Sequence, residues 1–178
     1  MKKFFFIDDY HTSLIDVQSK KTFIIYRNYK STPNISDILK LKNYCKKKGN
    51  PFLISNNIKI AVKLDLDGVY IPSFNKSYSH LSYNFKKKFL IVGSAHNLKQ
   101  INNKILQNCK YIFVSSLFKK NQNYLGFIKF KILTKNIEKL LIALGGINNS
   151  NIKKLRMIKL KGFAGISFFK NLGPHERP

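Results

Sequence analysis

A short apolar run that ends in two glycines, LLIALGGIN at residues 140–148, most constrains the fold of this chain. Its apolar residues do not alternate with polar ones, which is typical of a strand buried on both faces. Gly145 and Gly146 follow, and residues 148–150 offer N-cap side chains to a helical segment at 149–158. A strand that stops in a glycine pair before a helix N-terminus can bind phosphate through backbone N–H groups.

The segment GFAGIS at residues 162–167 repeats this pattern. A lone glycine pair more often marks only a tight turn between a strand and a helix, and that interpretation stays open here. Two such turns, one strand–helix unit apart, favour a shared phosphate site. Its expected residues are Gly145, Gly146, Gly165, Ile166 and Ser167.

The length and composition bound the class of protein. We expect residues 1–178 to form a single domain with a substantial core. The longest apolar runs are far shorter than a membrane span, and MKKFFFIDDY does not fit a signal peptide, so a cytoplasmic protein without a membrane partner is expected. Cys45 and Cys109 form no CxxC pair, which indicates neither a disulfide framework nor a zinc site.

The strongly basic composition has two explanations. Lys and Arg total 33 against 8 acids, a formal charge of +25, which attracts nucleic acid and other polyanions. The lysines are spread along the whole chain, however, and accompany many Asn and Ile, as a codon bias toward adenine and thymine produces. This distribution favours codon bias over nucleic-acid binding, and no RNA- or DNA-binding signature is present.

Short apolar runs alternate with polar, helix-like stretches. Strands are expected at residues 3–8, 22–27, 52–55, 68–71, 89–95, 111–116, 140–145 and 163–167. Helices are expected at 33–48, 58–64 and 98–106, and residues 10–19 suggest a short connection. Residues 126–133 alternate like a strand, but their place in the succession predicts a helix. Eight strands with long crossovers predict an α/β fold, a (β/α)8 barrel (TIM barrel), with an open doubly wound sheet as the alternative.

In such a barrel the chemistry lies where the strands end. The residues at the predicted strand ends are small, polar or basic: Asp8, Asp9, Arg27, Lys30, Ser55, Asn56, Asn57, Ser73, Asn75, Ser94, His96, Ser115, Ser116, Gly145, Gly146, Gly165 and Ser167. This set suits a phosphorylated ligand.

Six sequence blocks occur in the order and spacing of a known family. They are IIYRNYK, SNNIKIAVKLDLDGVYIP, LIVGSAHN, KYIFVSSLF, LIALGGIN and GFAGISFF. Together they cover nearly the whole chain, which resembles the thiamine-phosphate synthase and thiazole tautomerase family. Within it the chain is similar to a divergent variant with Arg-x-Tyr after strand two and Ser-Ala-His after strand five.

The resemblance implies a (β/α)8 barrel and a transferase of thiamine biosynthesis. Such enzymes join hydroxymethylpyrimidine diphosphate to thiazole phosphate. Arg and Lys stabilise the departing diphosphate, Mg²⁺ neutralises it, and a glycine-rich pocket holds the thiazole phosphate. Catalysis of this kind rests on electrostatic stabilisation and positioning. The implied partners are small phosphorylated substrates, and a homo-oligomeric state stays open.

The implied diphosphate and phosphate positions match the family in part. Arg27 takes the place of the diphosphate-binding arginine, whereas Tyr29 stands where the family has a lysine and Lys30 is displaced by one residue. The lysine of the loop after strand six is replaced by Lys119 or Lys120. The expected substrate-binding set therefore comprises Ser94, Ser115, Lys120 and the residues of the two glycine turns.

The implied metal positions have lost their charge. Asn56 and Asn75 stand where the family has metal-binding aspartates after strands three and four. Because Mg²⁺ prefers charged oxygen ligands, we expect its affinity to fall sharply. Asp67 precedes Gly68 and is expected to be a turn residue rather than a ligand.

His96 suggests a second activity. Thiazole tautomerases of this family use a histidine near the end of strand five as acid and base, and His96 stands in about that position. It can transfer a proton near neutral pH, although a surface or helix-capping histidine is an equal alternative. Tyr70 is expected to pack rather than to catalyse. The sequence thus predicts a thiamine-phosphate synthase-like protein, with a tautomerase-like or catalytically silent phosphate-binding barrel as the alternative.

Overall fold

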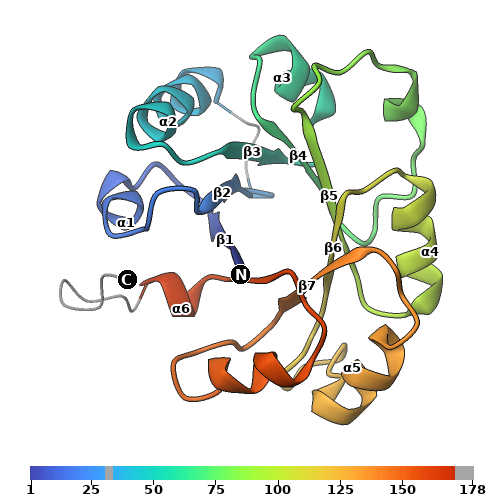
Figure 1. Ribbon diagram of the computed structural model, residues 1–178. Helices are drawn as coiled ribbons and strands as arrows, with labels where there is room; N and C mark the ends of the chain where they lie inside the picture. The colour runs from blue at the N-terminus through green and yellow to red at the C-terminus, as the bar shows by residue number, and fades with distance from the viewer. Residues whose placement is uncertain (31–33, 171–178) are drawn as a thin grey trace.

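The structure is a computed structural model that describes residues 1–30 and 34–170. Eight parallel strands pair in chain order, and the last closes on the first (Figure 1). They are β1 (Lys2–Ile7), β2 (Phe23–Tyr26), β3 (Phe52–Ser55), β4 (Gly68–Ile71), β5 (Leu90–Ala95), β6 (Tyr111–Val114), β7 (Leu140–Leu144) and β8 (Gly162–Gly165). The predicted (β/α)8 barrel is confirmed, and the open sheet is wrong because β8 pairs with β1.

The connections form a ring around the barrel (Figure 1). The α-helices are α1 (Thr12–Asp16), α2 (Ile35–Lys48), α3 (Ile58–Lys63), α4 (Leu98–Leu106), α5 (Gly126–Thr134) and α6 (Ser167–Lys170), and the 3-10 helices are η1 (Ser79–Ser82) and η2 (Ile152–Met157). The helix at α5 is confirmed. Its buried residues, Phe130 and Thr134, are one helical turn apart, and the Thr134 hydroxyl donates to Phe130 O at 2.8 Å.

Two local predictions are wrong and a third is confirmed in part. Residues 10–19 contain the helix α1, which a short connection did not predict. The helical segment predicted at 149–158 is present only as the short 3-10 helix η2, and the Asn148 side chain caps the turn before it by accepting from Asn151 N at 3.1 Å. The last strand ends at Gly165, because Ser167 begins α6 and turns Phe168 and Phe169 into the core. Tertiary packing of the two phenylalanines therefore overrides the extended pattern of the segment.

The helix predicted at 33–48 is confirmed from Ile35 onward, and position 33 lies outside the described residues. The Asn34 side chain caps it by accepting from Ser36 N at 2.9 Å. Gly49 ends it in the left-handed conformation, with φ 77°. No helix within residues 1–30 and 34–170 has the length and apolar character needed to cross a membrane.

The core has two layers that follow from strand alternation. Phe4 and Phe6 of β1 point into the barrel, whereas Phe5 and Ile7 belong to the layer between strands and helices. Aromatic rings fill much of the interior, and the Phe4 ring lies 4.8 Å from that of Phe113. A barrel packed in this way is solid, so ligands can bind only at its ends.

Candidate functional site

The predicted site residues lie at or beyond the end of the barrel where the strands finish, here called the mouth. A pocket of about 790 Å³ opens there beside the ends of β1, β2 and β8. Arg27, Lys30 and Ile166 all line it, together with Asp8 and Asp9. Predicted residues from two distant parts of the sequence therefore share one cavity.

Arg27 is held over an aromatic surface. Its guanidinium carbon lies 4.6 Å from the centroid of the Phe6 ring, a cation–π arrangement that fixes the side chain above the barrel core. Lys30 is exposed, and it lines the same pocket without such support. The guanidinium is therefore the better positioned of the two cations.

Tyr70 packs inside the barrel, as predicted, and also carries a polar contact. The fully buried ring lies 5.2 Å from that of Phe6, and its hydroxyl donates to Ser94 Oγ at 2.8 Å. Burial raises the pKa of Tyr70 to about 12, against the opposing effects of Ser94 and Arg27. The phenol is therefore neutral at physiological pH, and Ser94 is a buried hydrogen-bond acceptor for it.

Tyr29 bridges two strand ends. Its hydroxyl is 2.8 Å from Ser55 Oγ at the end of β3, and its ring meets Phe74, after β4, edge-on at 5.9 Å. Burial raises its pKa, more than the Ser55 contact and the Arg27 charge lower it. An aromatic bridge thus stands where the resemblance implies a lysine.

His96 and Ser115 meet across the ends of β5 and β6. His96 Nδ1 lies 2.9 Å from Ser115 O and 3.0 Å from Ser115 Oγ. Because a carbonyl only accepts, the contact with Ser115 O suits the tautomer with its hydrogen on Nδ1 and its lone pair on Nε2. Asn97, whose side chain accepts from Gln100 N at 3.0 Å, caps α4, so the helix-capping alternative for His96 is wrong.

The glycine pair after β7 packs tightly against the loop after β6. Gly145 and Gly146 have φ of 104° and 72°, and a Cβ on Gly146 would lie 2.5 Å from Lys119 N. Gly145 O accepts from Phe118 N at 2.8 Å. The glycines are thus required for a tight turn and a close approach, while phosphate binding by their N–H groups remains a prediction. Lys120 is exposed on this loop.

The two glycine turns are neighbours. Leu144 of β7 pairs with Ala164 of β8, so Gly145 and Gly165 follow paired positions. Beyond Gly165, Ile166 is exposed and lines the mouth pocket, and Ser167 begins α6. The structure therefore brings the predicted phosphate residues to one side of the mouth.

Asn56 and Asn75 contact each other directly. Asn75 Nδ2 donates to Asn56 Oδ1 at 2.7 Å, so the two residues form what we call the amide pair. No group of three or more His, Cys, Asp or Glu residues is placed to hold a metal within the described part of the chain. The residues present do not fit the Mg²⁺ that the family resemblance implies. The Asp67 carboxylate accepts from Phe52 N at 2.8 Å, at the starts of β3 and β4 and therefore at the other end of these strands from the amide pair.

Sequence reasoning missed Lys104, which is fully buried in α4. Its ammonium donates to Pro72 O and Asn75 O, both at 2.8 Å, and to Gln107 Oε1 at 2.7 Å. A lysine three residues after the buried Ile101 lies on the apolar face of the helix, and this position was the available signal. Lys104 thus supports the loop that carries Asn75.

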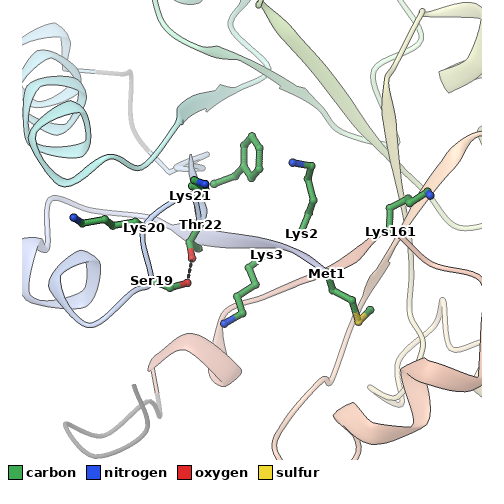
Figure 2. A pocket seen from close by; sticks show the side chains of 9 residues that line it. Met1, Lys2, Lys3, Ser19, Lys20, Lys21, Thr22 and Lys161 are labelled. Atoms are coloured by element: carbon green, nitrogen blue, oxygen red, sulfur yellow. Dashed lines mark hydrogen bonds between the residues drawn. The ribbon is translucent and has the colours of Figure 1, made fainter. Parts of the chain in front are cut away.

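A second basic pocket lies at the opposite end, which we call the base. It measures about 400 Å³ and is lined by Lys2, Lys3, Lys20, Lys21 and Lys161, among others. Figure 2 shows Lys3, Lys20 and Lys161 extending in different directions rather than meeting. A phosphate site needs convergent donors, so the mouth is the better candidate.

Comparisons with known proteins support the fold and relate the chain to one family. A family model described as thiamine monophosphate synthase matches residues 12–169. A thiamine-phosphate synthase of Prochlorococcus marinus is 30% identical over 163 residues, which cover 88% of this chain and 47% of that protein. One of Helicobacter pylori is 31% identical over 136 residues, covering 72% of this chain and 62% of that protein.

A solved structure, the thiamine phosphate pyrophosphorylase of Pyrococcus furiosus, superposes with a TM-score of 0.74 at 17% identity. The superposition covers 93% of this chain and 85% of the Pyrococcus chain, and it supports the fold alone. The chain spans less than half the length of the Prochlorococcus protein. On the match over residues 12–169, the chain belongs to the thiamine monophosphate synthase family.

Proposed function

We propose that this barrel is a thiamine-phosphate synthase-like transferase that condenses hydroxymethylpyrimidine diphosphate with thiazole phosphate at its mouth. The observation that supports this most is the position of Arg27. Its guanidinium lies over the Phe6 ring, and Arg27 lines the pocket of about 790 Å³. A fixed guanidinium stabilises charge that develops on a departing diphosphate, because it needs no reorganisation during the reaction.

The remaining groups have roles that suit this reaction. Lys30 adds a mobile cation at the pocket rim. The neighbouring turns at Gly145 and Gly165 supply the side of the mouth proposed for the thiazole phosphate, with Ile166, Ser167 and Lys120. Ser94 and Ser115 are buried at the ends of β5 and β6, where their hydroxyls contact Tyr70 and His96 and can position these two side chains.

The test is direct. Purified protein is incubated with both substrates, with Mg²⁺ in one arm and EDTA in the other, and thiamine phosphate is measured. Product that disappears in Arg27→Met supports the proposal. Absence of product in both arms, with thiazole phosphate still bound, contradicts the synthase reaction.

A tautomerase-like reaction on thiazole phosphate is the second candidate, favoured by His96. With Nδ1 turned to Ser115 O, the Nε2 lone pair can accept a proton from a ligand. Conversion of a thiazole tautomer that is lost in His96→Gln, with unchanged thiazole phosphate binding, would support this reaction. Equal rates in the two proteins would exclude His96 as the base.

A further inference from the structure

The arrangement of the amide pair suits an anion better than a cation. Asn56 Oδ1 accepts from Asn75 Nδ2 at 2.7 Å, and Asn75 Oδ1 accepts from Ser77 N at 2.8 Å. Both amide oxygens are therefore engaged with N–H donors. While the two amides are hydrogen-bonded to each other, one presents its nitrogen to the oxygen of the other, so the two oxygens do not face one cation.

The pair is also held firmly from both sides. Asn56 has a left-handed backbone, with φ 56°, and its N–H donates to Tyr70 O at 2.8 Å. On the other side, Asn75 O accepts from Lys104 Nζ at 2.8 Å and from Gln107 Nε2 at 3.1 Å. These contacts fix the backbone of both residues and so keep the two side-chain amides next to each other.

The loop that bears Asn75 is supported over a longer stretch. Gln107 Nε2 also donates to Ser77 O at 2.8 Å, and Gln107 O is 2.8 Å from Nε2 of the buried His80. Gly93 of β5 leaves room for the lysine, because a Cβ there would lie 2.7 Å from Lys104 Cδ. A fixed ammonium therefore lies directly beneath Asn75, where it opposes a divalent cation and favours an anion.

We infer that the amide pair replaces the metal site of the family and that the mouth binds a diphosphate directly, without a divalent cation. The remaining polar hydrogens of Asn56 Nδ2 and Asn75 Nδ2 donate to the oxyanion, and Arg27 and Lys30 neutralise it. The inference rests on the proposed function in one respect, that the mouth receives a phosphorylated ligand.

Calorimetric titration with inorganic pyrophosphate tests this, once in EDTA and once with excess Mg²⁺ so that the ligand is its magnesium complex. The native chain should bind the metal-free ion more tightly. Asn56→Asp with Asn75→Asp should invert the preference, shifting the ratio of the two Kd values by at least about tenfold. Asn43→Asp with Asn102→Asp, on the outer faces of α2 and α4, adds the same charge away from the mouth and should leave the preference unchanged.

The outcomes separate this inference from the proposed function. Tighter binding of the magnesium complex by the native chain would overturn direct binding and leave a synthase-like reaction standing. No pyrophosphate binding in either buffer would overturn both. The measurement on the native chain decides the matter even if the double Asp variant, checked by circular dichroism, fails to fold.

Discussion

The two ends of the barrel both carry positive charge, and they differ in how that charge is held. At the base, Lys2 Nζ lies 5.3 Å from the centroid of the Phe23 ring, but Lys3, Lys20 and Lys161 extend in different directions around the pocket (Figure 2). At the mouth, Arg27 is fixed over Phe6, and Lys104 is buried with three oxygen acceptors. Composition alone puts cations on any surface, whereas recognition of one anion requires cations that are fixed and convergent.

The sharpest test of this difference compares one cation from each end. Arg27→Met keeps much of the apolar stem and removes the guanidinium, so pyrophosphate binding should weaken by about 100-fold. Lys161→Met, at the base, should change it by less than about twofold at moderate salt. Calorimetry measures both, and similar losses in the two variants would show that only bulk charge matters.

The next test concerns the turns of the mouth. Gly146→Ala should lower the free energy of unfolding by about 2 kcal/mol, because a left-handed alanine must also displace the backbone at Lys119. Gly165→Ala is the matched control, since nothing lies within 4 Å of its Cβ, and it should change stability by less than about 0.5 kcal/mol. Denaturant unfolding compares the stability of the two variants. Equal losses of stability would show that Gly146 does not pack closely against the backbone at Lys119.

The third test measures how the burial of Lys104 makes the stability of the protein depend on pH. Burial lowers the pKa of Lys104 from 10.5 to about 8. Between these values the unfolded chain keeps a proton that the folded chain has released, so the contribution of this group to stability rises with pH and is lost as pH falls toward 8. The stability of the native chain relative to Lys104→Met should therefore increase by about 1.5 kcal/mol between about pH 8 and 9.5. A difference that stays constant in denaturant melts would show that the ammonium is not desolvated.

The smallest effect is expected at the base. Replacing Lys2, Lys20 and Lys161 by Gln should weaken nonspecific RNA retention only as much as replacing three exposed lysines elsewhere, Lys129, Lys135 and Lys153. Filter binding at two salt concentrations should place the two triple variants within about twofold of each other. A larger loss from the base would mean that its pocket is a specific polyanion site.

The order of the elements was predictable because each strand is a compact apolar run between polar helices, a local signal. The boundaries were less predictable where packing decided them. The extended pattern assigned Ser167 to a strand, but Ser167 begins a helix because Phe168 and Phe169 are buried in the core. The family resemblance located Asn56 and Asn75, but nothing in their spacing showed that they bond to each other.

The sequence by itself determined the parallel barrel, its family and the residues that reach the mouth, because apolar periodicity and motif order are properties of the linear sequence. Only the tertiary structure decided which of these residues meet. It paired Asn56 with Asn75, turned His96 Nδ1 to Ser115 and buried Lys104 beneath the loop after β4. The physical reason is that hydrogen bonds and desolvation depend on distances between strands, and these exist only once the ring of strands has closed.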